Sequence, residues 1–344
     1  MVHLETIINR PPSFSNTTVN MHYGIIIFEV ILMKQINLGG SELSASRIVL
    51  GCMRISQMDD ASLSKHLNTA LGLGINNFDH ADIYGKGECE TKFGKILKDE
   101  LRREDIILQS KCGIRYGHTA GEDIEYYDLS KEHIIYSVDA ILQRLGTDYL
   151  DLLMLHRPDT LMDTGEIAEA FDRLEQSGKV RHFGLSNFNA VQFDYVQRYT
   201  NQKLITNQMQ FGPAEPKIIS SGLQANTPFA GAADRDGGLL DYVRLNDVTL
   251  QAWSPFHYGY FDGIFPDDPK YKVLNEKLET IGEAHGISKS AAAVAWILRH
   301  PAGMQTIIGT TNTARLKEIA KADDVSLSKE EWYSIYKAAG HVIP

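Results

Sequence analysis

Four polar residues lie at or just beyond the C-terminal ends of short apolar runs in this chain, and together they could transfer a proton. Asp79 ends the run INNFD, and Tyr84 follows it by five residues. Lys111 ends IILQSK, and His156 ends LDLLMLH. Because a parallel α/β barrel carries its chemistry at the C-terminal ends of its strands, these residues are candidates for one pocket. A phenol, an ammonium, a carboxylate and an imidazole would form a proton-donating site that needs no metal.

Tyr84 is the candidate proton donor of this group. A free tyrosine has a pKa near ~10, which makes it a poor acid at neutral pH. A neighbouring ammonium lowers that pKa, and Lys111 could do so while Asp79 keeps Lys111 charged and oriented. His156 could hydrogen-bond the reacting oxygen, so that an oxyanion is protonated as a hydride arrives at carbon. The alternative is a structural ion pair and a core histidine, and the presence of all four residues at neighbouring strand ends disfavours it.

The elements that must position these residues form eight strand–helix repeats. The expected strands are 48–53, 75–79, 106–111, 150–155, 181–186, 205–210, 248–254 and 306–310. The expected helices are 60–71, 131–145, 163–177, 189–199, 237–246, 270–285, 289–299 and 312–322, with Ser130 as the N-cap of the second. Since the composition does not change along these repeats, they predict one closed (β/α)8 barrel.

Segments outside the repeats are expected to close the barrel floor and to shape its mouth. Lys34–Leu38 and Ser46–Leu50, around Gly39-Gly40, predict a β-hairpin across the floor. Long loops are expected at 113–129, 211–236 and 255–270, each following a barrel strand. Such loops usually form the substrate mouth of a barrel.

The N-terminal segment differs from the rest of the chain. Residues 1–32 show no barrel periodicity, and the apolar patch 24–33 is too short to span a bilayer. This segment also lacks the cationic start and the cleavage site of a secretory signal. We therefore expect a disordered or appended extension at 1–32 and the barrel at 33–344.

Charge and cysteine content restrict the partners and the compartment. The formal net charge is −10, whereas nucleic acids and anionic membranes bind clustered positive charge. Three cysteines without CxxC spacing fit a reducing cytoplasm. The sequence contains no HxH or HExxH pair, no Walker A sequence and no GxSxG elbow, so a metal-dependent barrel hydrolase is disfavoured. The sequence does not indicate an oligomeric state.

Three motifs make the chain resemble the aldo-keto reductase superfamily, from about Met33 to the C-terminus. They are FDHADIYG (78–85), LGTDYLDLLMLHRPD (145–159) and GKVRHFGLSNF (178–188). The sequence segments HRPD and SGLQAN are most similar to those of a bacterial branch of predicted oxidoreductases. The resemblance implies that Asp79, Tyr84, Lys111 and His156 match the catalytic tetrad, with Tyr84 as the general acid.

The resemblance also implies a nicotinamide dinucleotide cofactor. The residues implied for the carboxamide, the nicotinamide face and the pyrophosphate are Ser186, Asn187, Gln208, Trp253, Ser254 and Pro255. The segment implied for the adenosine 2′-phosphate contains Gly309, Thr310, Thr311 and Arg315. Gly309 stands where many members carry lysine, but Arg315 can make a bidentate phosphate contact. We therefore expect NADPH to be preferred, with NADH possible.

The expected substrate pocket is mainly aromatic, as ligand pockets commonly are. Its candidate residues are Met53, Arg54, Tyr116, Phe256 and Tyr258. Arg54 or Arg157 could meet a substrate carboxylate, although a surface ion pair is the simpler interpretation of each. The sequence thus predicts an NAD(P)H-dependent reductase of small aldehydes or ketones. The rival prediction is a cofactor-binding regulatory or redox-sensing subunit with little turnover.

Overall fold

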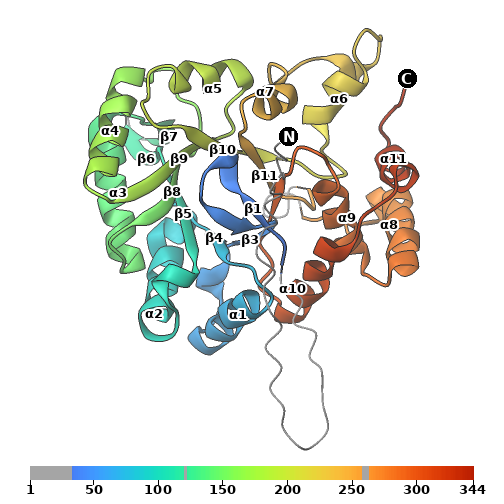
Figure 1. Cartoon of the computed structure of the whole chain (residues 1–344), viewed down its shortest axis with the longest axis horizontal. Helices are drawn as coiled ribbons and strands as arrows, with labels where there is room; N and C mark the ends of the chain where they lie inside the picture. The colour runs from blue at the N-terminus through green and yellow to red at the C-terminus, as the bar shows by residue number, and fades with distance from the viewer. Residues whose placement is uncertain (1–32, 120–121, 258–262) are drawn as a thin grey trace, which may run out of the picture. The chain divides into compact units, whose positions relative to one another are not determined.

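Eight parallel strands close into a barrel, which confirms the predicted fold (Figure 1). The computed structural model describes residues 33–119, 122–257 and 263–344. In chain order the barrel strands are β3 (Ile48–Gly51), β4 (Asn77–Asp79), β5 (Ile107–Cys112), β8 (Leu150–Leu155), β9 (Val180–Ser186), β10 (Leu204–Gln210), β11 (Thr249–Trp253) and β12 (Gln305–Ile308). Each strand pairs with the next along the chain, and β12 closes the ring against β3.

Helices pack around the outside of the barrel. The eight predicted helices are present as α1 (Asp60–Gly72), α3 (Lys131–Leu145), α4 (Thr164–Gln176), α5 (Ala190–Gln197), α7 (Leu239–Leu245), α8 (Lys272–His285), α9 (Lys289–Leu298) and α10 (Thr313–Ala320). The Ser130 hydroxyl accepts a hydrogen bond from the backbone N–H of His133, which confirms the predicted N-cap of α3. The sequence prediction missed α2 (Glu88–Glu100), α6 (Lys217–Leu223) and α11 (Lys329–Ala338).

Helix α2 was missed because its internal glycine disfavours a helix in isolation. In the folded protein, Gly94 is the point of closest approach between α2 and α3. A Cβ added there would lie 2.4 Å from the carbonyl oxygen of Arg144. Tertiary packing therefore requires the glycine and stabilises the helix around it.

A β-hairpin covers the barrel floor, as predicted, but with a different second arm. β1 (Gln35–Asn37) pairs with β2 (Ser44–Ser46), and Leu38 and Ala45 pack against barrel residues that include Ile205. The predicted arm 46–50 is wrong because Ile48 already begins barrel strand β3. Gly39 has a φ of 54°, and a Cβ there would lie 2.5 Å from the carbonyl oxygen of Ile205. The turn therefore requires glycine at this position.

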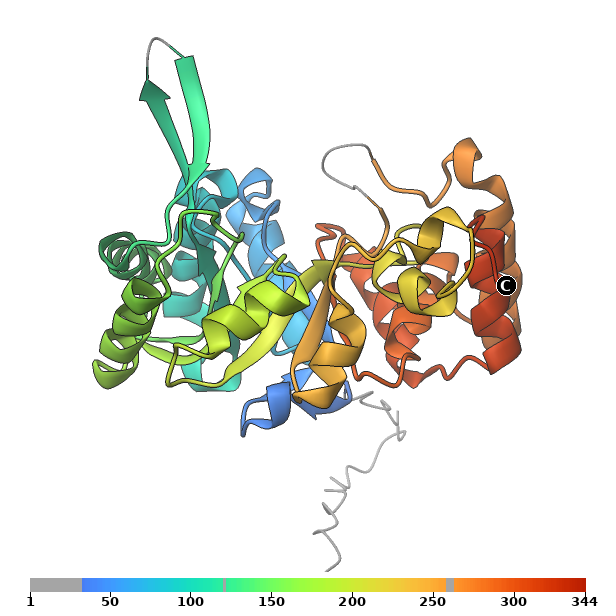
Figure 2. The ribbon, with the colours of Figure 1, turned by 90° about the horizontal axis from the view of Figure 1, so that it is seen from above.

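The long segment predicted between β5 and α3 is present, but it contains a second hairpin that was not predicted. β6 (Ile114–Thr119) pairs with β7 (Glu122–Tyr127) in antiparallel register. Figure 2 shows this hairpin projecting from the barrel beyond the C-terminal end of β5. Every residue of β7 is exposed, so the segment lacks the apolar–polar alternation that indicates a half-buried strand.

Within the described residues, no helix is long and apolar enough to cross a membrane. The extension expected at 1–32 lies outside the described residues.

Candidate active site

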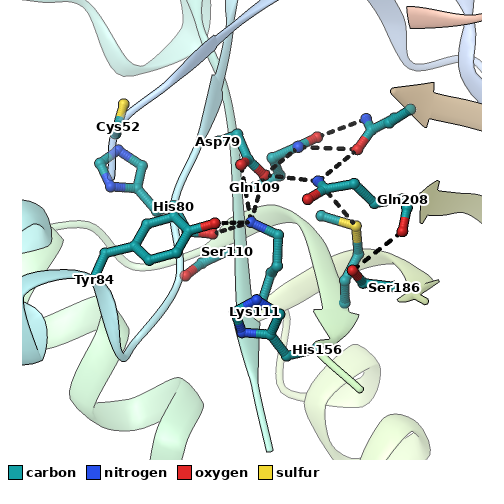
Figure 3. Close-up of polar contacts among 12 residues, drawn as sticks. Cys52, Asp79, His80, Tyr84, Gln109, Ser110, Lys111, His156, Ser186 and Gln208 are labelled. Carbon is teal, nitrogen blue, oxygen red and sulfur yellow. Dashed lines mark hydrogen bonds and ion pairs between the residues drawn. The ribbon is translucent and has the colours of Figure 1, made fainter. Parts of the chain in front are cut away.

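The ammonium of Lys111 lies at the centre of a buried polar cluster (Figure 3). Its Nζ donates to Oδ2 of Asp79 at 2.9 Å, to the carbonyl oxygen of His80 at 2.8 Å and to the hydroxyl of Tyr84 at 3.1 Å. The rings of Tyr84 and His156 meet edge to face, with centroids 6.1 Å apart. The four residues expected to share a pocket therefore lie together.

Barrel topology explains this juxtaposition. Asp79 is the last residue of β4, Lys111 lies near the end of the neighbouring β5, and His156 directly follows β8, which is the next strand. The backbone N–H of His156 continues the ladder by donating to the carbonyl oxygen of Cys112. Tyr84 begins a 3₁₀ turn, Tyr84–Gly87, and its hydroxyl points toward the Lys111 ammonium (Figure 3).

Burial and neighbouring charges together set the protonation of this cluster. Burial by itself lowers the pKa of Lys111, but Asp79 and Tyr84 outweigh it and raise the pKa, so Lys111 is charged. The pKa of His156 falls well below its ordinary value because of burial and the charges of Lys111 and Arg157, so the imidazole is neutral.

The pKa of Tyr84 is raised, so its expected direction is wrong. Burial is the largest effect and raises the pKa of Tyr84, and the Asp79 carboxylate acts in the same direction. Lys111 lowers the pKa and offsets only part of this rise. Tyr84 is therefore a fully protonated phenol at neutral pH, with an ammonium in place to stabilise its anion.

A second polar cluster lies next to the first. The indole N–H of Trp253 donates to Oδ1 of Asn187 at 3.1 Å. The side-chain amide of Asn187 donates to the hydroxyl of Ser186 at 2.9 Å and to the carbonyl oxygen of His156 at 3.2 Å. Asn187 has a φ of 65°, an uncommon left-handed conformation for a residue other than glycine. The residues expected around a nicotinamide carboxamide thus adjoin the tetrad directly.

Gln208 joins the two clusters. Its Nε2 donates to Oδ1 of Asp79 at 3.0 Å, while its backbone carbonyl accepts from the hydroxyl of Ser186 at 3.3 Å. Its side-chain oxygen has no hydrogen bond among the residues that the structure describes. Sequence reasoning missed Gln109, whose Nε2 donates to the same Asp79 oxygen at 2.7 Å. Gln109 lies inside an apolar run and carried no motif that could have indicated this contact.

Two arginines lie at the expected 2′-phosphate segment. Arg54 donates through Nε and Nη2 to the carbonyl oxygen of Gly309, at 3.0 and 2.5 Å. Burial, together with the positive charge of Arg315, lowers the pKa of Arg54. Within the described residues neither guanidinium pairs with a carboxylate. The backbone N–H of Arg315 donates to the Asn312 side chain, which caps the N-terminus of α10.

The other expected cofactor residues border these clusters. The hydroxyl of Thr310 accepts from the backbone N–H of Asn312 at 3.2 Å, and Thr311 is exposed. Ser254 follows β11 with a φ of 47°. Pro255 is buried, and its carbonyl oxygen would lie 2.3 Å from a Cβ on Gly212.

The structure describes four of the five residues expected to form the substrate pocket. The Met53 carbonyl accepts from the Cys89 thiol at 3.3 Å, and Phe256 meets Phe265 edge to face. Tyr116 is 63% exposed on β6. Tyr258 lies outside the described residues.

A buried carboxyl group, Glu90, and a partly buried one, Asp82, lie near Lys111. Glu90 accepts from the hydroxyl of Ser110 and from Nε of Arg144, both at 2.7 Å. Burial and the nearby Glu90 raise the pKa of Asp82 to about 7. The backbone N–H of Asp82 donates to the carbonyl oxygen of Lys111, so this pair adjoins the strand that carries the central ammonium.

The family model for the aldo/keto reductases matches residues 47–339 of this chain. The chain belongs to the aldo/keto reductase family. It is therefore an oxidoreductase, and its general activity is the reduction of small carbonyl compounds. The predicted family and enzyme class are confirmed.

Several relatives resemble this reductase over most of their length. Oxidoreductase YdhF of Escherichia coli is 36% identical over 306 residues, which cover 87% of this chain and 95% of that protein. A 6-dehydroglucose reductase of Agrobacterium fabrum is 35% identical over 305 residues, with coverage of 87% and 95%. The holo form of an aldo-keto reductase from Bacillus halodurans superposes with a TM-score of 0.72 at 26% identity, covering 91% of this chain and 98% of that one.

Proposed function

We propose that this protein is an NADPH-preferring carbonyl reductase that uses Tyr84 as its general acid. The observation that carries this proposal is the Lys111 ammonium, which hydrogen-bonds both the Tyr84 hydroxyl and the Asp79 carboxylate at the strand ends. A bound nicotinamide would supply the hydride from its C4 atom to an aldehyde or ketone. The chain's own residues would bind the carbonyl oxygen and deliver the proton.

The protonation states support these roles. Tyr84 carries its proton at neutral pH, and Lys111 stabilises the phenolate left after donation. A neutral His156 can donate one hydrogen bond to a carbonyl oxygen without itself transferring a proton. The oxygen would thus be bound by His156 and protonated by Tyr84 as negative charge develops on it.

The cluster next to the tetrad fits a nicotinamide. The side-chain oxygen of Gln208, which has no hydrogen bond to any described residue, can accept from an amide, and Trp253 offers a partly exposed ring beside Asn187. These groups adjoin Asp79, so a ring held there would lie close to the proton donor. This proximity is what hydride transfer to a carbonyl carbon, with protonation of its oxygen, requires.

The two arginines favour NADPH over NADH. Arg54 and Arg315 bring like charges close together without a carboxylate partner among the described residues, and a phosphate dianion would relieve that repulsion. Arg54 donates to the carbonyl oxygen of Gly309 in the segment proposed for the phosphate, which supports a role toward the cofactor over contact with a substrate carboxylate.

The relatives suggest where to look for substrates. The Agrobacterium fabrum relative is named for the reduction of 6-dehydroglucose, so aldehydes derived from sugars belong in the first set of substrates. The decisive experiment measures NADPH oxidation with simple aldehydes, ketones and these sugars. Tyr84→Phe should lower turnover by roughly 10²–10⁴-fold with little change in cofactor affinity. Near-parental turnover in Tyr84→Phe would refute the assigned acid.

The same measurement separates a reductase from a regulatory subunit. Many turnovers per protein molecule support the reductase. A single turnover followed by arrest, with NADP retained, would support the cofactor-binding subunit in its place.

A further inference from the structure

Four glutamines form a continuous file through the barrel interior. Gln109 on β5, Gln208 on β10, Gln251 on β11 and Gln305 on β12 are each at most 3% exposed. Buried carboxamides need hydrogen-bond partners, and these four supply them to one another. Figure 3 shows Gln109 and Gln208 at the end of the file that meets Asp79.

The file runs from the barrel floor to the tetrad. Gln305 Nε2 donates to the carbonyl oxygen of Ser46 at 2.7 Å, and Gln251 Nε2 donates to Gln305 Oε1 at 2.8 Å. Gln251 and Gln109 form a reciprocal pair, with N–O distances of 2.9 and 3.1 Å. Gln109 then donates to Asp79 Oδ1 at 2.7 Å.

The two ends of the file determine how every amide points. The orientation of a glutamine amide is assigned from its hydrogen-bond partners, and both end groups here only accept. The Ser46 carbonyl requires the NH₂ of Gln305, so the oxygen of Gln305 must accept from Gln251. The oxygen of Gln251 must then accept from Gln109, whose NH₂ is directed toward Asp79. Turning any one amide would set oxygen against oxygen and nitrogen against nitrogen.

We propose that Gln109 and Gln251 are positioning residues for proton donation, a role that rests on the proposed function of the tetrad. Gln109 gives Asp79 a donor whose direction Gln251 fixes, and so holds the carboxylate that orients Lys111. Gln208 adds a second amide donor to the same oxygen at 3.0 Å. Donors on a carboxylate disperse its negative charge, which limits how strongly that charge opposes ionisation of Tyr84.

The charged and titratable groups around Asp79 define the effect of losing this donor. Lys111 faces Asp79 from β5, Tyr84 lies beyond Lys111, and the buried thiol of Cys52 feels the Asp79 charge from the β3 side. Without the Gln109 donor, more of the carboxylate charge acts on Lys111 and Tyr84. The pKa of Tyr84 then rises further, and Lys111 is less well placed to stabilise the phenolate.

A graded set of methionine variants tests the proposal. Methionine has nearly the length of glutamine but neither a donor nor a strong acceptor. Gln109→Met should lower kcat roughly tenfold and move the alkaline limb of the kcat/KM profile to higher pH, with cofactor Kd unchanged. Gln251→Met should shift the profile in the same direction by less, because it acts through Gln109.

Gln305→Met is the matched control. It removes an equally buried glutamine of the same file, which touches neither Asp79 nor Gln109. It should lower Tm but leave the pH profile in place, because the Asp79 carboxylate still orients Gln109 and Gln251 from the other end of the file. A purely structural file would lower Tm in all three variants and shift no profile, and that result would overturn the proposal.

The outcomes remain decisive if one variant misfolds or if the parent is inactive. If Gln109→Met fails to fold, the pH profile of kcat/KM for Gln251→Met tests the proposal in its place. If the parent protein oxidises NADPH with none of the carbonyl compounds tested, that result would overturn both the proposed function and this inference. An active parent whose profile is unchanged in the variants overturns the inference alone.

Discussion

The guanidinium of Arg54 lies beside the space into which a side chain at position 309 would project. It donates twice to the carbonyl oxygen of Gly309, and a Cβ built on Gly309 would lie 3.6 Å from its Nη2. The resemblance implies a lysine at position 309 in many members of the family. In this chain the guanidinium of Arg54 reaches that position instead, across the pairing of β12 with β3. This relationship changes what substitutions at the cofactor site should do.

Arg54→Ala and Arg315→Ala should each weaken NADPH binding by roughly tenfold or more and NADH binding much less, because each would remove one of the proposed charge-assisted phosphate contacts. Calorimetric titration of both nucleotides measures this. Equal losses for NADH and NADPH would show that the arginines support the loop and do not contact the phosphate.

Gly309→Lys should not strengthen NADPH binding in the parent, because Arg54 repels a second cation in that space. In the Arg54→Ala background the same lysine should recover NADPH affinity. Recovery is measured as the NADPH Kd of the double variant against Arg54→Ala alone. A double variant no better than Arg54→Ala would contradict this exchange of roles.

Lys111→Met should suppress carbonyl reduction and move the alkaline limb of kcat/KM to higher pH. Burial already raises the pKa of Tyr84, and Lys111 is the group that opposes this rise. Without the ammonium, the phenol holds its proton more tightly and donates it less readily. The pH profile and cofactor Kd are measured together. Lys86→Met, an exposed charge on the same turn, is the control and should leave the profile unchanged.

Gln208 should present only its oxygen to a bound cofactor, because both amide hydrogens are used by Asp79 and Gln251. The acetylpyridine analogue of NADP, which lacks the amide donor of nicotinamide, should therefore bind at least several-fold more weakly than NADP. In Gln208→Met the methionine side chain neither donates nor accepts hydrogen bonds strongly. This variant should therefore bind the two nucleotides about equally. A parent that binds both nucleotides alike would contradict this orientation of Gln208.

Asp82 should make the fold less stable as the pH rises. Its pKa is about 7 in the folded protein because of burial and Glu90, against roughly 3.9 in an unfolded chain. The folded state therefore binds the extra proton, and this stabilisation, complete below the unfolded pKa, is lost as the pH rises through 7. Denaturant midpoints at pH 5 and pH 8 should differ less in Asp82→Asn than in the parent. Asp99→Asn, an exposed carboxylate on α2, should behave like the parent.

Residues 1–32 should be dispensable for the barrel. Met33 is buried in the main hydrophobic core and packs beside Gly74, so a protein that begins at Met33 retains the first residue seen to support the fold. Circular dichroism and NADPH oxidation should match the full-length chain. An insoluble or inactive Met33-start protein would assign a structural role to the extension.

The sequence by itself determined the barrel and the meeting of Asp79, Lys111 and His156. Their strands are fully buried runs separated by helical periodicity, and parallel strands bring their C-terminal ends to one face whatever the details of packing. Tyr84 could be placed with them because it follows Asp79 so closely. The hairpin β6–β7 escaped notice because an exposed ribbon does not require alternating polarity.

Only the tertiary structure decided the groups that act across the barrel. Gln109 and Gln251 lie far apart in the chain on strands that do not pair, and they meet only because closure of the barrel turns their side chains to one interior. Arg54 meets Gly309 because closure sets β12 beside β3. The direction of the Tyr84 pKa depended on burial outweighing a nearby ammonium, and burial is a property of packing that no local spacing of residues contains.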